Sequence, residues 1–157
     1  MIAIDPNTAA ALWRYCTSRQ PEEACGALIG VERKGEFIVT GFFPIANRSP
    51  QPTASFQFDA SEWAELYMRY RVVPGDPTED KQSTGLIGTF HSHPAGPAAP
   101  SAADLESASI IRTELPVHLI LALQTRDWFA YRLTKNHSSA LGGEWFIGLN
   151  IRISPPA

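Results

Sequence analysis

The sequence predicts an α+β fold, in which a mixed β-sheet has helices packed on its faces. Short apolar runs bounded by glycine, proline and polar turn residues are typical of strands. Other segments repeat their apolar residues with the 3.6-residue period of a helix. The chain has 157 residues, of which 44% are hydrophobic and 18% charged, and this fits one globular domain over residues 1–157.

In the first half of the chain, four strands and two helices are expected. Strands are expected, in chain order, at residues 1–4, 23–31, 36–43 and 55–59. The turn Lys34-Gly35 joins the second and third of these strands into a hairpin. Helices are expected from Asn7 or Thr8 to about Ser18 and from Asp59 or Ser61 to about Arg71, because these polar residues are preferred at helix N-termini.

The second half begins with a polar, proline- and glycine-rich segment at residues 74–84, which predicts a surface loop. Further strands are expected at residues 86–90, 117–123 and 127–133, with an edge strand near residues 145–147. A helix is expected from Ala102 to Arg112, with Ser101 as its N-cap. His118 falls within an apolar strand, where a structural hydrogen bond is its simplest role.

The stretch from Phe90 to Asp104 carries the residues from which a function can be inferred. His91 and His93 are two residues apart at the end of a strand, so their rings point to the same side of the sheet. A loop stiffened by three prolines follows, and Ser101 then places Asp104 in the first helical turn, beside the positive end of the helix dipole. Two imidazoles and a carboxylate, with a fourth position left to water, form the ligand set of a catalytic zinc site.

These residues also have simpler interpretations when each is taken alone. Ser101 and Asp104 together are typical of a capping box, and a single histidine at a strand end usually makes an ordinary hydrogen bond. The combination of the histidine pair, the stiff loop, the cap and the carboxylate favours a metal site.

The motif resembles the His-x-His-x7-Ser-x2-Asp signature of the JAMM (MPN+) zinc metallopeptidases, and it matches that signature without a gap. Prokaryotic single-domain members also carry a glutamate in a Pro-x-Glu-x-Cys-Gly context. Here that context is matched by Pro21-Glu22-Glu23-Ala24-Cys25-Gly26. The resemblance covers residues 23–133 and implies the cytidine-deaminase-like MPN fold.

The resemblance implies a role for each residue of the motif. His91, His93 and Asp104 would bind one Zn²⁺ per chain, and Glu23 would act as general base and then general acid. Ser101 would donate a hydrogen bond to the oxyanion. Neighbouring strand residues point to opposite faces, so only one of Glu22 and Glu23 is expected to face the metal, and Ser92 is expected to point away from it.

The implied function is hydrolysis of a peptide or isopeptide bond at the C-terminal Gly-Gly of a ubiquitin-like or sulfur-carrier protein. The alternative is a catalytically silent MPN scaffold that serves as an interaction module, although such members lack the ligands that this chain has. A nucleobase deaminase on a related fold would need His-x-Glu and Pro-Cys-x-x-Cys, and the sequence has neither. The sequence does not indicate the oligomeric state.

The composition limits the classes of partner and the cellular compartment that are expected for this chain. The net charge is −3 and the 13 basic residues are scattered, so the sequence predicts no nucleic-acid partner. Cys16 and Cys25 belong to no Cys-x-x-Cys pair and are expected to be reduced, buried side chains. The sequence shows neither a leader peptide pattern nor a long apolar run, so a cytoplasmic protein without membrane contact is expected.

Overall fold

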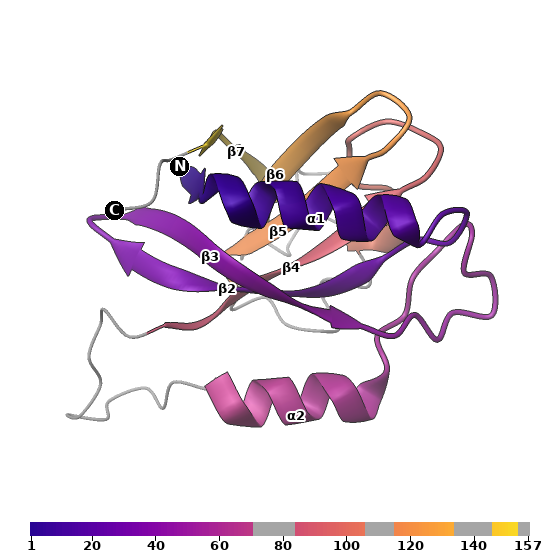
Figure 1. The fold of residues 1–157 in the computed structure, drawn as a ribbon, viewed down its shortest axis with the longest axis horizontal. Coiled ribbons are helices and arrows are strands. Elements are labelled where there is room, and N and C mark those ends of the chain that lie inside the picture. Colours follow the sequence, from indigo (N-terminus) through magenta and orange to yellow (C-terminus); the bar gives the residue numbers. More distant parts are fainter. Residues whose placement is uncertain (71–83, 106–114, 134–145, 154–157) are drawn as a thin grey trace, which may run out of the picture.

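The computed structural model describes residues 1–70, 84–105, 115–133 and 146–153, which contain one mixed sheet, two helices and a further helical turn at residues 102–105 (Figure 1). The strands are β1 (Ile2–Ile4), β2 (Cys25–Arg33), β3 (Glu36–Ile45), β4 (Gly85–His93), β5 (Val117–Ala122), β6 (Asp127–Leu133), β7 (Phe146–Leu149) and β8 (Ile151–Ile153). The helices are α1 (Pro6–Ser18) and α2 (Ala60–Tyr70). Figure 1 shows α1 and α2 on opposite sides of the sheet, and the predicted α+β class is confirmed.

The strand order places β4, which carries the histidine pair, in the middle of the sheet. The order is β7-β6-β5-β4-β2-β3-β1-β8. β4 pairs antiparallel with β2 and parallel with β5, so backbone hydrogen bonds hold it on both sides. The histidine side chains therefore project from a rigid central strand.

The last two strands lie at opposite ends of this order, although only Asn150 separates them in the chain. β7 pairs with β6, and β8 pairs with β1. The backbone N–H of Ile2 donates to the carbonyl of Asn150 at 2.8 Å. The segment from β7 to β8 therefore links both edges of the sheet. The edge strand expected near residues 145–147 is confirmed as β7, whereas β8 had no counterpart in the sequence prediction.

Helix α1 begins earlier than the sequence predicted. Its N-cap is Asp5, whose Oδ2 accepts a hydrogen bond from the backbone N–H of Thr8 at 3.0 Å, and Pro6 is the first helical residue. The expected caps, Asn7 or Thr8, were therefore wrong. Aspartate is among the preferred N-caps, and proline suits the first helical position, where its missing N–H leaves no bond unmade.

The short strand expected at residues 55–59 is absent as a regular element. Within this segment Phe58 makes only an isolated bridge with Asn47. The side chain of Asn47 bonds the backbone of Ser55 and Gln57, so these groups are satisfied without a partner strand. Helix α2 then follows from Asp59, one of its two predicted caps, whose Oδ1 accepts from Glu62 N at 2.9 Å.

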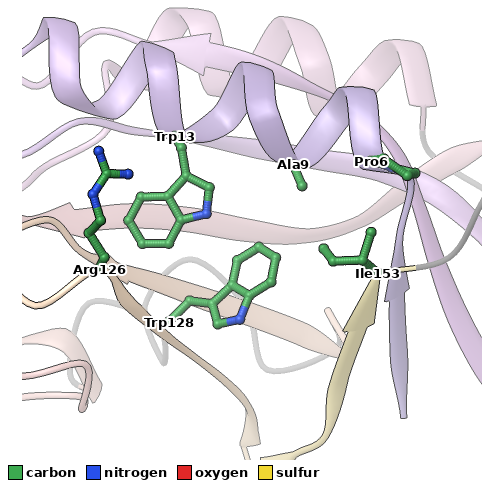
Figure 2. Close-up of a pocket in the computed structure, with 6 residues that line it drawn as sticks. All are labelled: Pro6, Ala9, Trp13, Arg126, Trp128 and Ile153. Atoms are coloured by element: carbon green, nitrogen blue, oxygen red, sulfur yellow. The ribbon is translucent and has the colours of Figure 1, made fainter.

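The described residues form three apolar clusters, and the two largest lie on opposite faces of the sheet. The first includes the α1 residues Leu12 and Cys16, and the second is packed against Trp63 and Leu66 of α2. On the α1 side, a groove of about 440 Å³ lies between the helix and strands β6 and β8. It is lined by Pro6, Ala9, Trp13, Arg126, Trp128 and Ile153, as Figure 2 shows.

Some predictions concern residues that the structure does not describe. These are residues 74–83 of the expected loop and the expected helix beyond Leu105. Within the described ranges, neither helix is long and apolar enough to cross a membrane. Cys16 and Cys25 are both buried free thiols, as expected.

Candidate metal centre

Four side chains from three parts of the chain meet on the α2 side of the sheet. Glu23, His91, His93 and Asp104 each offer one ligand atom, and these atoms all lie within 4.8 Å of one another. The histidines end β4, and Cys25 of the adjacent strand β2 is in register with His91, which brings Glu23 to the same point. The structure therefore gathers four of the five residues that the sequence assigned to the site, and the fifth, Ser101, is bonded to Asp104.

The three expected metal ligands form a tight triangle. His93 Nε2 lies 3.0 Å and His91 Nε2 lies 3.3 Å from Asp104 Oδ2. The two Nε2 atoms are 3.2 Å apart. His91 is 3% exposed and Asp104 6% exposed, so water screens this cluster weakly.

The hydrogen bonds of His93 indicate how the triangle fits a cation. Its Nδ1 is 2.8 Å from the carbonyl oxygen of Pro97, which can only accept, so Nδ1 carries the proton. Burial by itself would lower the pKa of His93, but its bonds with Asp104 and with the Pro97 carbonyl raise that pKa, which favours a proton on Nε2 that is donated to Asp104 Oδ2 at 3.0 Å in the metal-free chain. A metal ion held by these atoms would take the place of that proton. Two imidazole nitrogens and a carboxylate oxygen are the donor set that Zn²⁺ accepts.

The charge states of His91 and Asp104 suit metal ligands. Burial lowers the pKa of His91, which keeps its ring neutral. Burial by itself would raise the pKa of Asp104, but its bonds with His91 and His93 hold that pKa well below the ordinary value. Metal ions bind the neutral imidazole and the ionised carboxylate.

Glu23 lies beside the triangle and has a different environment. The side chain is 5% exposed, and within the described part of the chain its Oε1 has no hydrogen-bond partner. Burial raises the pKa of Glu23 to about 7. Glu22, by contrast, is only partly buried and pairs with Arg19 at 3.5 Å. Of the two acids, only Glu23 belongs to the cluster.

Ser101 and Asp104 form the reciprocal bonds of a capping box. The backbone N–H of Asp104 donates to Ser101 Oγ at 3.1 Å, and the backbone N–H of Ser101 donates to Asp104 Oδ2 at 2.9 Å. The cap therefore orients the carboxylate toward the histidines. Asp104 is thus a capping-box residue and a member of the cluster at the same time. Ser92 points away from the cluster, as expected, and its Oγ accepts from Ala24 N at 2.8 Å.

Comparison with protein families supports the motif. Residues 6–134 match the family model described as prokaryotic homologs of the JAB domain. The chain belongs to this family. The predicted family is thereby confirmed, and the match includes all four residues of the cluster.

One curated relative of this JAB-domain protein matches it in sequence, and two solved structures match it in fold. A curated relative, desampylase from Haloferax volcanii, is 29% identical over 89 residues, which are 57% of this chain and 56% of the relative. The match therefore spans little more than half of that protein. A solution structure from Desulfitobacterium hafniense has a TM-score of 0.74 at 24% identity and covers 99% of this chain and 94% of its own. Another, from Salinibacter ruber, has a TM-score of 0.62 at 24% identity over 98% and 92%.

Sequence reasoning missed one aromatic residue of the JAB-domain site. The ring of Phe56 stacks on the ring of His91 with centroids 4.4 Å apart and an interplanar angle of 26°. The alternating residues Ser55-Phe56-Gln57-Phe58 gave a strand signal, which was wrong, and no signal for a contact with the histidine. The contact arises because residues 46–59 fold back over the end of β4.

His118 lies outside the metal cluster of the JAB domain, as expected. Its Nδ1 is 2.8 Å from Thr89 Oγ1, so the predicted structural hydrogen bond is confirmed. Burial lowers the pKa of His118 to about 4. The buried ring is therefore neutral at pH 7.

We expect His118 to make the protein less stable in mild acid. Its folded pKa of about 4 lies below its ordinary value of 6.5, so the unfolded chain takes up the proton first as the pH falls. This contribution to the free energy of unfolding is complete above pH 6.5 and decreases toward pH 4, by roughly 3 kcal/mol. Denaturant midpoints at several pH values measure it, with metal-free protein in every sample. His118→Gln should flatten the dependence, and an unchanged slope in that variant would rule out this origin.

Proposed function

We propose that this chain is a zinc-dependent metallopeptidase that hydrolyses an amide bond next to a C-terminal Gly-Gly. The observation that carries the proposal is the cluster of Glu23, His91, His93 and Asp104, with ligand atoms within 4.8 Å of one another. Among them, His91 is neutral and Asp104 is ionised, as metal ligands must be, and Glu23 is a buried carboxylate whose Oε1 has no described partner. A scaffold would not require such a group.

His91, His93 and Asp104 would hold one Zn²⁺ per chain through two nitrogens and one oxygen. When bound there, the ion would polarise the scissile carbonyl and lower the pKa of a water toward about 7. The two histidines lie at the end of a rigid strand and Asp104 lies in a short capped turn. His91 and Asp104 are buried from water. The carbonyl of Pro97 keeps the His93 proton on Nδ1 and leaves Nε2 to face the ligand position.

Glu23 would accept a proton from the attacking water and then deliver it to the leaving amine. Burial raises the pKa of Glu23 to about 7 in the metal-free chain, which brings the group into the range that suits a general base and acid at neutral pH. Burial excludes competing solvent, and Oε1 has no described partner that would hold the proton elsewhere.

Ser101 would donate a hydrogen bond to the oxyanion that forms during hydrolysis. Its Oγ already accepts from the backbone N–H of Asp104, which leaves the hydroxyl hydrogen available as a donor. One serine would then serve as the helix cap and as the oxyanion donor at the same time.

We expect Ser101→Ala to lower kcat by about 100-fold with little change in KM, because the lost bond forms only in the transition state. Removal of the cap alone would cost roughly 1 kcal/mol of stability and leave kcat per folded molecule unchanged. Ser101→Asp still caps the helix but places a negative charge near the oxyanion, so it should be folded and inactive. Steady-state kinetics and denaturation on the three proteins separate the roles, and an active, folded Ser101→Asp would leave the serine as a cap only.

The proposed substrate is a ubiquitin-like or sulfur-carrier protein. The curated relative bears the name of an enzyme, desampylase, which supports a catalytic role over a scaffolding one. A cytoplasmic setting, expected from the two reduced cysteines, is part of the same proposal.

Intact-mass analysis tests the function directly. Zinc-loaded protein is incubated with ubiquitin-like proteins that carry a C-terminal peptide extension or a lysine-linked conjugate, and cleavage after Gly-Gly is expected. The metal-free protein is the control and should leave both substrates whole. A zinc-loaded protein that cleaves neither substrate would favour the interaction module.

A further inference from the structure

The side-chain amide of Asn47 lies at the centre of the segment that covers the candidate site. Its Nδ2 donates to the carbonyl oxygens of Glu23 and Ser55, at 3.0 Å each. Its Oδ1 accepts from the backbone N–H groups of Ser49 and Gln57, at 3.0 Å each. The partners fix the orientation of the amide, because carbonyls lie on one side and N–H groups on the other.

Two of these bonds flank the aromatic residue that contacts the metal cluster. Ser55 and Gln57 are the neighbours of Phe56, so the amide of Asn47 holds the backbone on both sides of that ring. The ring in turn stacks on His91 at 4.4 Å. The orientation of His93 is held by the carbonyl of Pro97, whereas this stacking contact holds the ring of His91.

A third bond reaches the other half of the site. The Glu23 carbonyl accepts from Asn47, and the Glu23 N–H donates to the carbonyl of Pro52 at 2.8 Å. Both backbone groups of Glu23 are therefore bonded to the segment that carries Phe56. One amide thus connects the proposed proton carrier with the ring that lies against a proposed ligand.

We propose that Asn47 is a positioning residue for the site, acting through Glu23 and through Phe56 on His91. This inference rests on the proposed function for its kinetic part, whereas its geometric part concerns the metal-free chain. Sequence position gives no hint of this role, because Asn47 lies in a turn-rich loop far from both motifs.

The first test is structural and needs no substrate. In metal-free protein, NMR measures the ring-proton shift of His91, which reports the stacked Phe56, and the hydrogen exchange of the Glu23 N–H. Asn47→Asp is nearly isosteric and keeps the two accepted bonds, but it loses the donated ones. It should speed exchange of the Glu23 N–H by about 10-fold or more and move the His91 ring shift.

Ser49→Ala is the matched control. It removes the Ser49 Oγ contacts with Ser55 Oγ and Gln51 N in the same loop and touches no bond to Glu23. It should leave both NMR signals unchanged, even if it lowers stability as much as Asn47→Asp. If it reproduced the Asn47→Asp changes, general loosening of the loop would explain them and the inference would fail.

The second test is kinetic. With zinc bound, Asn47→Asp should lower kcat by about 10-fold or more while KM stays within about twofold, because misplaced groups slow chemistry more than binding. Phe56→Leu separates the effect of Asn47 on His91 from its effect on Glu23. It should move the His91 shift and lower kcat while the Glu23 N–H stays protected from exchange. It also tests the role of the Phe56–His91 stacking contact if Asn47→Asp fails to fold.

The outcomes distinguish this inference from the proposed function. If the wild-type protein hydrolyses no substrate, the proposed function fails, and the NMR comparison still decides the role of Asn47. If the wild type is active and folded Asn47→Asp matches it in kcat, exchange and ring shift, the positioning role is wrong. An unchanged His91 shift and an unchanged kcat in Phe56→Leu would show that Phe56 does not position the ring of His91.

Discussion

Glu23→Gln is expected to lower kcat by at least about 100-fold while the protein still binds one zinc per chain. The amide has nearly the same shape as the carboxyl group but cannot take up a proton near neutral pH. Glu23 is therefore expected to affect the chemistry and leave metal binding intact. Metal analysis of the purified variant and its rate of substrate cleavage measure the two properties separately.

Glu22→Gln is the matched control for this change. Glu22 is the preceding residue and also an acid, but it is only partly buried and pairs with Arg19 at 3.5 Å, so its replacement should leave kcat within about twofold. If Glu22→Gln were the inactive variant and Glu23→Gln the active one, the assignment of the glutamate motif would be wrong by one residue.

Most strands could be predicted because their signal is local. Residues 127–133 were expected as a strand and are β6 without a shift, and the apolar run at 117–123 is β5 to within one residue. β8 differs because it has only three residues, Ile151–Ile153, and its partner is β1 at the other end of the chain. A short segment with such a distant partner carries too little pattern to be recognised.

The candidate site likewise contains residues that local sequence patterns place and residues that only tertiary contacts place. His91, His93 and Asp104 lie within one strand–loop–helix unit, so alternation and capping place them together before any tertiary contact is known. Glu23 joins them only because β2 lies next to β4, and it was found through the resemblance to a family. Phe56 and Asn47 belong to a segment without regular periodicity, so their contacts with the site could not be read from the sequence.

Loss of a metal ligand is expected to have the largest effect. His91→Ala should weaken zinc binding by on the order of 100-fold or more and remove measurable hydrolysis, because one of three protein ligands is gone. Asp104→Asn should act similarly, although asparagine can still accept the capping bond from the Ser101 N–H. The Asp104→Asn variant therefore separates the loss of the negative charge from the loss of the helix cap. Zinc content after gel filtration gives the first measurement.

His118→Gln is the control, since His118 is a buried histidine outside the cluster and should keep one zinc per chain. Stability provides a second readout that is independent of activity. Zinc at 100 times its Kd should stabilise the wild type by about 2.7 kcal/mol, and this gain should disappear on addition of a chelator. The gain should also be absent in His91→Ala and Asp104→Asn. If both variants kept stoichiometric zinc and its stabilising effect, the ion would be bound elsewhere and the triangle of ligands would have to be reassigned.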